Sequence, residues 1–321
     1  MGSPKPNLNE DEIVERIRRT LAGGIEVAPA GDDCAFLTIP VGNAIQVSVD
    51  TVVGGVHVDL ALCSANDVGY KALMSALSDL AAVGARPLAA LVAMCVPDRD
   101  ATDLALGVTA GLADASGAAG CPVVGGDISS AGELMVSVTV IGTTDGEAPV
   151  ARSGAHGGDA IFVSGPLGAS AGGLRVLRDP IGSLAMSEEA AARDLIEHYR
   201  RPVAHLAQGL AARRCGAHAM IDVSDGLALD LHRLCDASGV GFALDEVPVA
   251  TGATLDEALG GGEDYVLVMT VAPGDVDALM ANFARDALAA PMRIGTIVTE
   301  RDVRSLAGRP LGRLGWQHSI G

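Results

Sequence analysis

The feature that most constrains the fold is an alternation of apolar strands and small-residue helices between residues 67 and 142. The pattern predicts helices over 67–83 and 101–119 and strands over 88–96, 121–124 and 133–142. Segment 88–96 is apolar without interruption, which is typical of a strand buried on both faces. Alternation of this kind predicts an α/β sandwich.

The apolar periodicity lapses around residues 143–151, and we place a domain boundary there. A length of 321 residues corresponds to about two domains. We therefore expect an N-terminal α/β domain over 1–147 and a C-terminal α/β domain over 148–321. The second half predicts strands over 160–164, 220–224, 266–271 and 292–298, with helices beginning near 169, 188, 204, 227 and 275. A further amphipathic helix is predicted over 10–21.

Composition excludes several classes of protein. The net charge of −18 argues against a general nucleic-acid binder, which usually carries a basic face. Apolar residues make up 49% of the chain and aromatic residues only 2%, so the core must be built from Ala, Val, Leu and Ile. No apolar run reaches membrane-span length, and the start does not resemble a secretory signal. Six cysteines without a CxxC pair favour a reduced, cytoplasmic setting.

Acidic residues recur where predicted strands end. They are Asp32 and Asp33, Asp50, Asp127, and Asp222 with Asp225, and Asp79 adds a carboxylate on the flank of the apolar stripe of helix 67–83. One such feature is an ordinary turn, but the recurrence predicts convergence on a site for several metal ions. Mg²⁺ prefers carboxylate oxygens and usually also contacts substrate phosphates. The plainer interpretations are a Gly-Asp-Asp turn, a solvated Asp79, and Ser224 or Asp225 as a helix N-cap.

The acid set suits phosphoryl transfer, in which positioning and charge neutralisation dominate. The chain contains neither a P-loop GxxxxGK[ST] nor the HRD and DFG motifs of protein kinases. Any nucleotide site must therefore belong to another architecture.

Seven motifs, in order along nearly the whole chain, resemble the thiamine-monophosphate kinase family of the aminoimidazole ribonucleotide synthetase superfamily. They are Gly31-Asp32-Asp33-Cys34-Ala35, Ser48-Val49-Asp50-Thr51 with His57, Tyr70-Lys71 through Gly84-Ala85, Gly125-Gly126-Asp127, Arg152-Ser153-Gly154-Ala155, Asp222 through Leu227, and Gly261-Gly262-Glu263-Asp264-Tyr265. Any one motif is unspecific, but the seven together are specific.

The resemblance implies transfer of the γ-phosphate of ATP to thiamine monophosphate, directly and in line, with several Mg²⁺ ions and no nucleophilic residue. It implies a homodimer that pairs its N-terminal sheets, with each active site in a cleft near that interface. The implied metal ligands are Asp33, Ser48, Asp50, Asp79, Asp127, Asp222 and Asp225, of which Asp50, Asp127 and Asp222 are the most critical. The implied ATP contacts are Gly126, Asp127, Arg152 and Ser224. The implied contacts to thiamine monophosphate are His57, Glu263 and Trp316.

Four positions depart from the family pattern. Thr is usual where Val49 and Ile128 stand, and Lys is common where His156 stands. Trp316 replaces a terminal Tyr and keeps an aromatic face for the thiamine ring. The plainer interpretations are that His57 is an ordinary polar residue on the surface and that Trp316 anchors the C-terminal tail.

Three alternatives remain open at this stage. The chain could phosphorylate another small molecule, serve as a non-catalytic nucleotide-binding dimer, or be a structural Ca²⁺-binding module. Calorimetry with an ATP analogue and Mg²⁺ separates these classes.

Overall fold

The computed structural model describes residues 16, 19–20, 44–98, 101–179 and 189–317. By internal contacts the chain divides into two compact units: residues 1–76 with 87–143, and residues 77–86 with 144–321. Asp33 and nearly all of the predicted helix 10–21 lie outside the described residues. The predicted α/β architecture in two parts is confirmed; the boundary at 147/148 stays a prediction.

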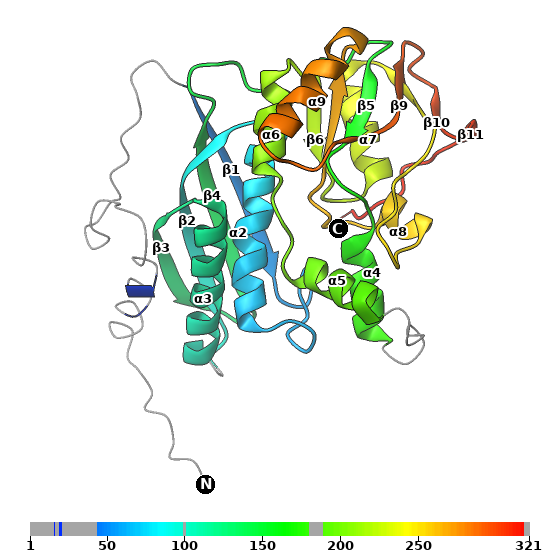
Figure 1. Cartoon of the computed structure of the whole chain (residues 1–321). Coiled ribbons are helices and arrows are strands. Elements are labelled where there is room, and N and C mark those ends of the chain that lie inside the picture. Colours follow the sequence, from blue (N-terminus) through cyan, green and yellow to red (C-terminus); the bar gives the residue numbers. More distant parts are fainter. Residues whose placement is uncertain (1–15, 17–18, 21–43, 99–100, 180–188, 318–321) are drawn as a thin grey trace. The chain divides into compact units, whose positions relative to one another are not determined.

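The first unit contains a four-stranded sheet in the order β1-β4-β2-β3 (Figure 1). Its strands are β1 (Ile45–Val53), β2 (Arg86–Val96), β3 (Val123–Ser130) and β4 (Met135–Thr143). β1 pairs with β4 in antiparallel fashion, and β2 pairs with β3 in parallel. β1 and β3 are therefore the two edge strands of this sheet.

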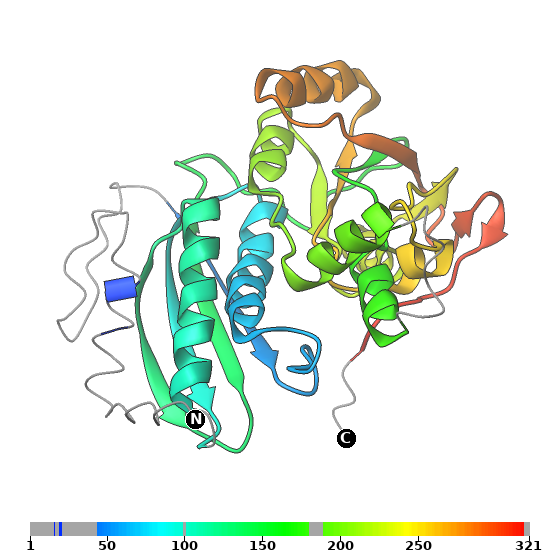
Figure 2. The same ribbon diagram turned by 60° about the horizontal axis from the view of Figure 1, so that its bottom comes forward.

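Two helices, α2 (Ala65–Ala82) and α3 (Ala101–Ala119), cover one face of this sheet (Figure 2). They pack closely because glycines meet backbone: a Cβ at Gly69 would lie 1.9 Å from the carbonyl oxygen of Val108. Ser64 and Asp67 cap the start of α2 reciprocally, with Asp67 N 3.2 Å from Ser64 Oγ and Ser64 N 2.9 Å from Asp67 Oδ2. This arrangement is a capping box with Asp in the place of the usual Glu.

Within the described residues, the other face of the sheet is open. Along β1, Val47 and Val49 are 57% and 62% exposed, while alternate residues point to the covered face. β2 alternates in the same way, with Leu91 exposed and Val92 buried. The prediction that segment 88–96 is buried on both faces is therefore wrong for the single chain, because the described helices cover one side and Leu91 on the other side is exposed.

The predicted strand-end position of two acids is also wrong. β1 continues past Asp50 to Val53, because its ladder with β4 runs unbroken from Ile45↔Thr143 to Val53↔Met135. β3 likewise runs through Gly125-Gly126-Asp127, because these residues pair with β2 instead of turning away. Asp50 and Asp127 thus lie inside strands. Asp222, by contrast, is the last residue of its strand.

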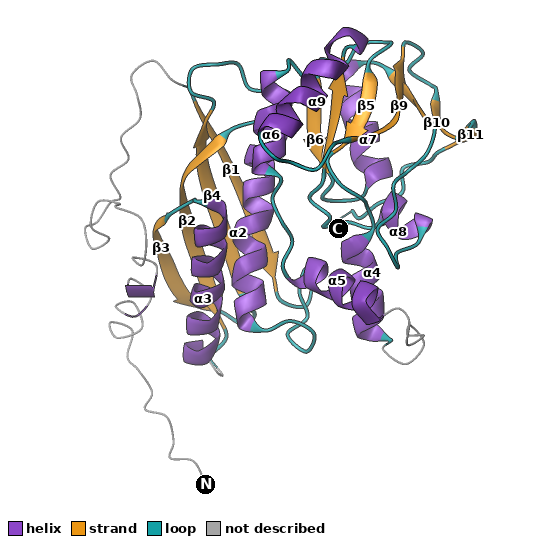
Figure 3. Cartoon of the chain, viewed as in Figure 1, coloured by secondary structure: helices purple, strands orange, loops and turns teal. Residues whose placement is uncertain are grey.

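The second unit contains a seven-stranded sheet in the order β11-β10-β7-β9-β5-β8-β6. Its strands are β5 (Ala160–Val163), β6 (Ala219–Asp222), β7 (Gly241–Leu244), β8 (Leu267–Val271), β9 (Met292–Val298), β10 (Arg304–Leu306) and β11 (Arg309–Pro310). β5, β6 and β8 are buried throughout. Figure 3 shows the helices of this unit around the sheet.

Apolar clusters cover both faces of the central strands of this sheet. On β5, Ile161 and Val163 join one cluster, while Ala160 and Phe162 join the other. The first cluster includes residues of α7 (Leu227–Ser238), and the second includes residues of α6 (Leu206–Arg214) and α9 (Val276–Arg285). The remaining helices are α4 (Ala169–Arg178), α5 (Glu189–Arg200) and α8 (Leu255–Gly260). Within the described part of the chain, no helix has both the length and the apolar character of a membrane span.

Candidate functional site

Asp222 is a strongly perturbed carboxylate among the predicted metal ligands of the second unit. It is 5% exposed at the end of β6 and accepts a 2.7 Å hydrogen bond from Ser78 Oγ. Burial and the nearby charge of Asp79 raise the pKa of Asp222 to about 7. Ser78 and Asp79 belong to residues 77–86, which group with this unit. A cation near Asp222 would relieve both costs, because an opposite charge favours the ionised carboxylate.

The turn after Asp222 is held by an acid that sequence reasoning missed. The carboxylate of Asp230, in the first turn of α7, accepts hydrogen bonds from the amides of Asp225 (2.9 Å) and Gly226 (3.1 Å). Arg233 Nη1 lies 2.7 Å from Asp230 Oδ1 and also pairs with the carboxylate of Asp225. The N-cap of α7 is Gly226, so the plainer interpretation of Ser224 or Asp225 as its N-cap is wrong.

Two other loops join this turn through backbone hydrogen bonds. Glu263 N donates to Ser224 O (2.8 Å), and Trp316 N donates to Asp225 O (2.9 Å). Gly262 allows this approach, because a Cβ there would lie 2.5 Å from Ser224 O. Glu263 has a left-handed backbone with φ 66°. The fold thus brings together Ser224, Glu263 and Trp316, which stand far apart in the sequence.

Asp264 anchors the glycine-rich loop formed by residues 260–263. This fully buried carboxylate accepts hydrogen bonds from the amides of Gly168 (2.5 Å) and Ser170 (3.0 Å) at the start of α4. Burial raises the pKa of Asp264, while those amide bonds oppose the rise. Beside this loop lies a cleft of about 560 Å³, lined by Ala171, Asp256, Glu257, Gly260, Gly261 and Leu314.

Trp316 is 53% exposed. A ring that anchored the tail would be expected to lie in the core, so this exposure does not favour the anchoring interpretation. Arg152, the predicted ATP contact, also has an exposed side chain. Its backbone oxygen accepts a 3.4 Å hydrogen bond from Ser238 Oγ, which fixes the start of the loop that precedes β5.

Of the other predicted metal ligands, the first unit holds the described residues Ser48, Asp50 and Asp127. Asp50 accepts a 2.8 Å hydrogen bond from the amide of Thr51. His57 is fixed in the turn after β1, where its Nδ1 accepts from Val53 N at 3.0 Å. Gly126 leaves room for the neighbouring strand, because a Cβ there would lie 2.0 Å from Val92 O.

The structure does not bring Asp50 and Asp127 together within the first unit. They lie on opposite edge strands, three strand spacings or about 14 Å apart. They also face opposite sides, since Asp50 pairs with buried Val138 and Asp127 pairs with exposed Ala93. One ion cannot contact both carboxylates of one chain in this arrangement.

The structure also buries charged residues to which the sequence analysis gave no role: Lys71, Asp159, Asp230 and Asp264. A charge inside a helix or a loop looks solvated in a sequence, and only tertiary packing buries it. Lys71 in α2 is only 1% exposed. A buried ammonium group is costly unless it is paired, so residues like these are candidates for essential roles.

The comparisons with known proteins cover both halves of the chain. Residues 31–144 match the AIR synthase related protein N-terminal domain, and residues 157–307 match the AIR synthase related protein C-terminal domain. Thiamine-monophosphate kinase of Mycobacterium tuberculosis is 38% identical over 276 residues, covering 81% of this chain and 80% of that protein. The Salmonella typhimurium enzyme is 39% identical over 251 residues, covering 75% of each chain.

Solved structures extend the likeness to three dimensions. Thiamine-monophosphate kinase of Stenotrophomonas maltophilia K279a superposes with a TM-score of 0.81 at 32% identity, covering 92% of this chain and 96% of that one. AaThiL in complex with AMPPCP and TMP superposes with a TM-score of 0.76 at 27% identity, covering 98% and 100%. Hydrogenase maturation protein HypE of E. coli, at 18% identity, shares the fold alone.

Proposed function

Because the chain belongs to the thiamine-monophosphate kinase family, we propose that it transfers the γ-phosphate of ATP to thiamine monophosphate and forms thiamine diphosphate. The observation that carries this proposal is the meeting of three loops, in which Glu263 N contacts Ser224 O and Trp316 N contacts Asp225 O. Of the residues in these loops, Ser224 is expected to contact ATP, and Glu263 and Trp316 are expected to contact thiamine monophosphate.

The donor atoms fit Mg²⁺. The expected ligands are carboxylates and one hydroxyl, which are oxygen ligands of the kind that Mg²⁺ prefers. We expect Ser48, Asp50, Asp79, Asp127, Asp222, Asp225 and Asp33 to hold the ions. Since Asp50 and Asp127 of one chain are about 14 Å apart, we expect more than one ion position. Bound Mg²⁺ would neutralise the charge of the phosphates.

The protein's own groups would bind and orient the two substrates. Arg152, with its exposed guanidinium, is suited to phosphate oxygens, which it can contact with two parallel hydrogen bonds. The exposed ring of Trp316 offers an aromatic face to the cationic thiamine ring. Gly126 lies within β3 beside Asp127, where its exposed backbone could contact a phosphate. Transfer would be direct and in line, with no covalent phosphoenzyme.

We also propose that the protein is a homodimer formed through the open face of the first unit's sheet. That face carries Ile45, Val47, Val49, Leu91 and Met135, all exposed in the single chain. Contiguous exposed apolar surface on a soluble protein marks an interaction site, and two-fold dimers are the commonest closed assembly. Asp127 shares a face with Ala93 on this side of the sheet, which fits an active site near the interface.

A coupled ADP-release assay tests the proposal. Thiamine monophosphate should support Mg²⁺-dependent ADP release, whereas thiamine and unrelated phosphomonoesters should not. Release with another acceptor but not with thiamine monophosphate would point instead to a different small-molecule kinase of the superfamily. ATP binding without any turnover would point to a non-catalytic nucleotide-binding protein.

A further inference from the structure

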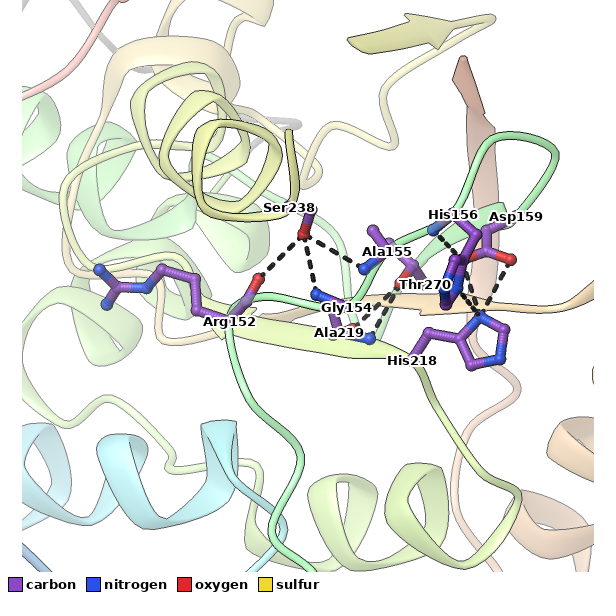
Figure 4. A network of polar contacts seen from close by, with 9 residues as sticks. All are labelled: Arg152, Gly154, Ala155, His156, Asp159, His218, Ala219, Ser238 and Thr270. Carbon is purple, nitrogen blue, oxygen red and sulfur yellow. Dashed lines mark hydrogen bonds and ion pairs between the residues drawn. The ribbon is translucent and has the colours of Figure 1, made fainter. Parts of the chain in front are cut away.

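A second cluster of metal-binding side chains lies in the second unit, apart from the acids assigned above. His156 and Asp159 belong to the loop before β5, and His218 immediately precedes β6 (Figure 4). We propose that His156, Asp159 and His218 form a binding site for a divalent transition-metal ion of the Zn²⁺ type. The site does not depend on the proposed kinase activity.

The spacing of the donor atoms fits such an ion. The Nδ1 atoms of His156 and His218 are 3.2 Å apart, and His218 Nδ1 lies 2.9 Å from Asp159 Oδ2. One ligand atom from each residue lies within 4.8 Å of the others. Tetrahedral Zn²⁺ with bonds of about 2.0–2.1 Å separates its ligand atoms by roughly 3.3 Å. The imidazole pair therefore needs only a small adjustment to bind one ion.

Hydrogen bonds alone satisfy the three side chains less completely than a bound metal ion would. Nδ1 of His218 faces both carboxylate oxygens of Asp159 and Nδ1 of His156. A ring nitrogen carries one proton at most, so it donates to one of these partners or shares that proton poorly between them. A metal ion accepts a lone pair from all three groups at once. It also neutralises Asp159, which is only 3% exposed.

The backbone holds the three side chains in place. Asp159 Oδ2 accepts a 2.8 Å hydrogen bond from His156 N, and Asp159 O accepts one from Ile297 N, also at 2.8 Å. His218 N donates to Thr270 O at 2.8 Å. Ser238 Oγ accepts from the amides of Gly154 and Ala155, each at 3.2 Å. Such second contacts orient metal ligands and strengthen binding.

The side chains leave access for the ion and for a water ligand. His156 is exposed, and the side chain of His218 is 32% exposed. His218 also lines a cleft of about 460 Å³, together with residues of 147–153 and 213–217. Two imidazoles and one carboxylate favour Zn²⁺ and Co²⁺ over Mg²⁺, which prefers oxygen ligands. The two imidazole ligands therefore distinguish this site from the oxygen ligands proposed to hold Mg²⁺.

The test is a Co²⁺ titration of the full-length protein, followed by visible absorption, with millimolar Mg²⁺ present and no nucleotide. We expect one equivalent to bind with the intense bands of a four-coordinate ion, and Zn²⁺ to displace it. His156→Lys and His218→Ala should each weaken binding at least about tenfold, because even outer contacts of a metal site matter that much. His198→Gln, which changes a half-buried histidine of α5, is the matched control and should bind Co²⁺ normally.

A thermal melt guards against misfolded variants. Zn²⁺ should raise the Tm of the wild-type protein and of His198→Gln but not that of His156→Lys, whose own Tm should match wild type because His156 is exposed. Unchanged Co²⁺ affinity in both His156→Lys and His218→Ala would overturn the proposal, as would the absence of binding to the wild-type protein. If the wild-type protein binds Co²⁺ but shows no kinase activity, that result would count against the proposed function alone.

Discussion

The sheets of the two units differ in how many of their faces are covered. In the second unit, apolar clusters cover both faces of β5, β6 and β8, and its predicted metal ligand Asp222 lies at a strand end. In the first unit, helices cover one face, the other exposes valines, and Asp50 and Asp127 lie inside edge strands. A sheet covered on both faces can place a site at the end of one of its strands. A sheet with an exposed apolar face is expected to bind a partner on that face.

The largest expected effect is on turnover, from either acid of the first unit. Asp50→Asn and Asp127→Asn should each lower kcat by about a thousandfold or more, because each removes a charged ligand worth several kcal/mol to the transition state. Neither side chain is buried, so thermal melting should change little. Steady-state assays at limiting Mg²⁺ provide the measurement. Near-normal turnover in both variants would refute the role of these acids.

The same comparison explains what the sequence could reveal. Long periodic segments were predictable: the helix expected over 101–119 has those bounds in α3. β7, α8, β10 and β11, which have two to six residues, were missed. The equally short β5 was predicted because its residues are all apolar. The pair Gly125-Gly126 looks like a turn, and only pairing with β2 shows that the strand continues.

The candidate site was predictable only in part, for a similar reason. Motifs identify residues such as Asp222 and Glu263, but not the contacts that hold them. Asp230 holds the turn at Asp225 from inside a helix, where an acid looks solvated. The cluster of His156 and His218 joins positions 62 residues apart, and no local pattern connects them.

A charge on the open face should break the assembly without damage to the second unit. Val49→Asp places a carboxylate in the middle of the proposed interface, where burying an unpaired charge is very costly. We expect light scattering to show a dimer for wild type and a monomer for Val49→Asp. Val203→Asp is the matched control, since Val203 is 49% exposed in the second unit. A wild-type monomer at micromolar concentration, with ATP and Mg²⁺ present, would contradict the dimer.

Asp222→Asn should remove activity and yet stabilise the metal-free protein above neutral pH. The folded-state pKa of Asp222 is about 7, above the ordinary value of 3.8, so the folded state binds the extra proton between these values. The contribution of Asp222 to wild-type stability should therefore fall as pH rises from about 4 to 8, by at most about 4 kcal/mol. Asn stays neutral and can still accept from Ser78.

Urea unfolding at pH 5 and pH 8 measures this difference. Asp222→Asn should lack the component of pH dependence that Asp222 contributes, and Mg²⁺ should restore stability at pH 8 to the wild-type protein more than to the variant. If both proteins respond equally to pH, Asp222 does not have the raised pKa described above.

The smallest effect is expected from Trp316. Trp316→Ala should raise KM for thiamine monophosphate about 5- to 30-fold, which corresponds to a cation–π contact of about 1–2 kcal/mol. ATP affinity and Tm should change little, because the ring is half exposed. In the wild-type protein, addition of thiamine monophosphate should change tryptophan fluorescence. A much lower Tm with unaltered KM would make Trp316 a structural anchor.

The central claim is that this chain moves a phosphate from ATP onto thiamine monophosphate. Phosphorus NMR of one reaction mixture, containing the protein, ATP, thiamine monophosphate and Mg²⁺, tests it most directly. We predict that ADP and the diphosphate of thiamine diphosphate appear in equal amounts, with no orthophosphate. Orthophosphate in place of the new diphosphate, or an unchanged spectrum with folded dimeric protein, would contradict the account.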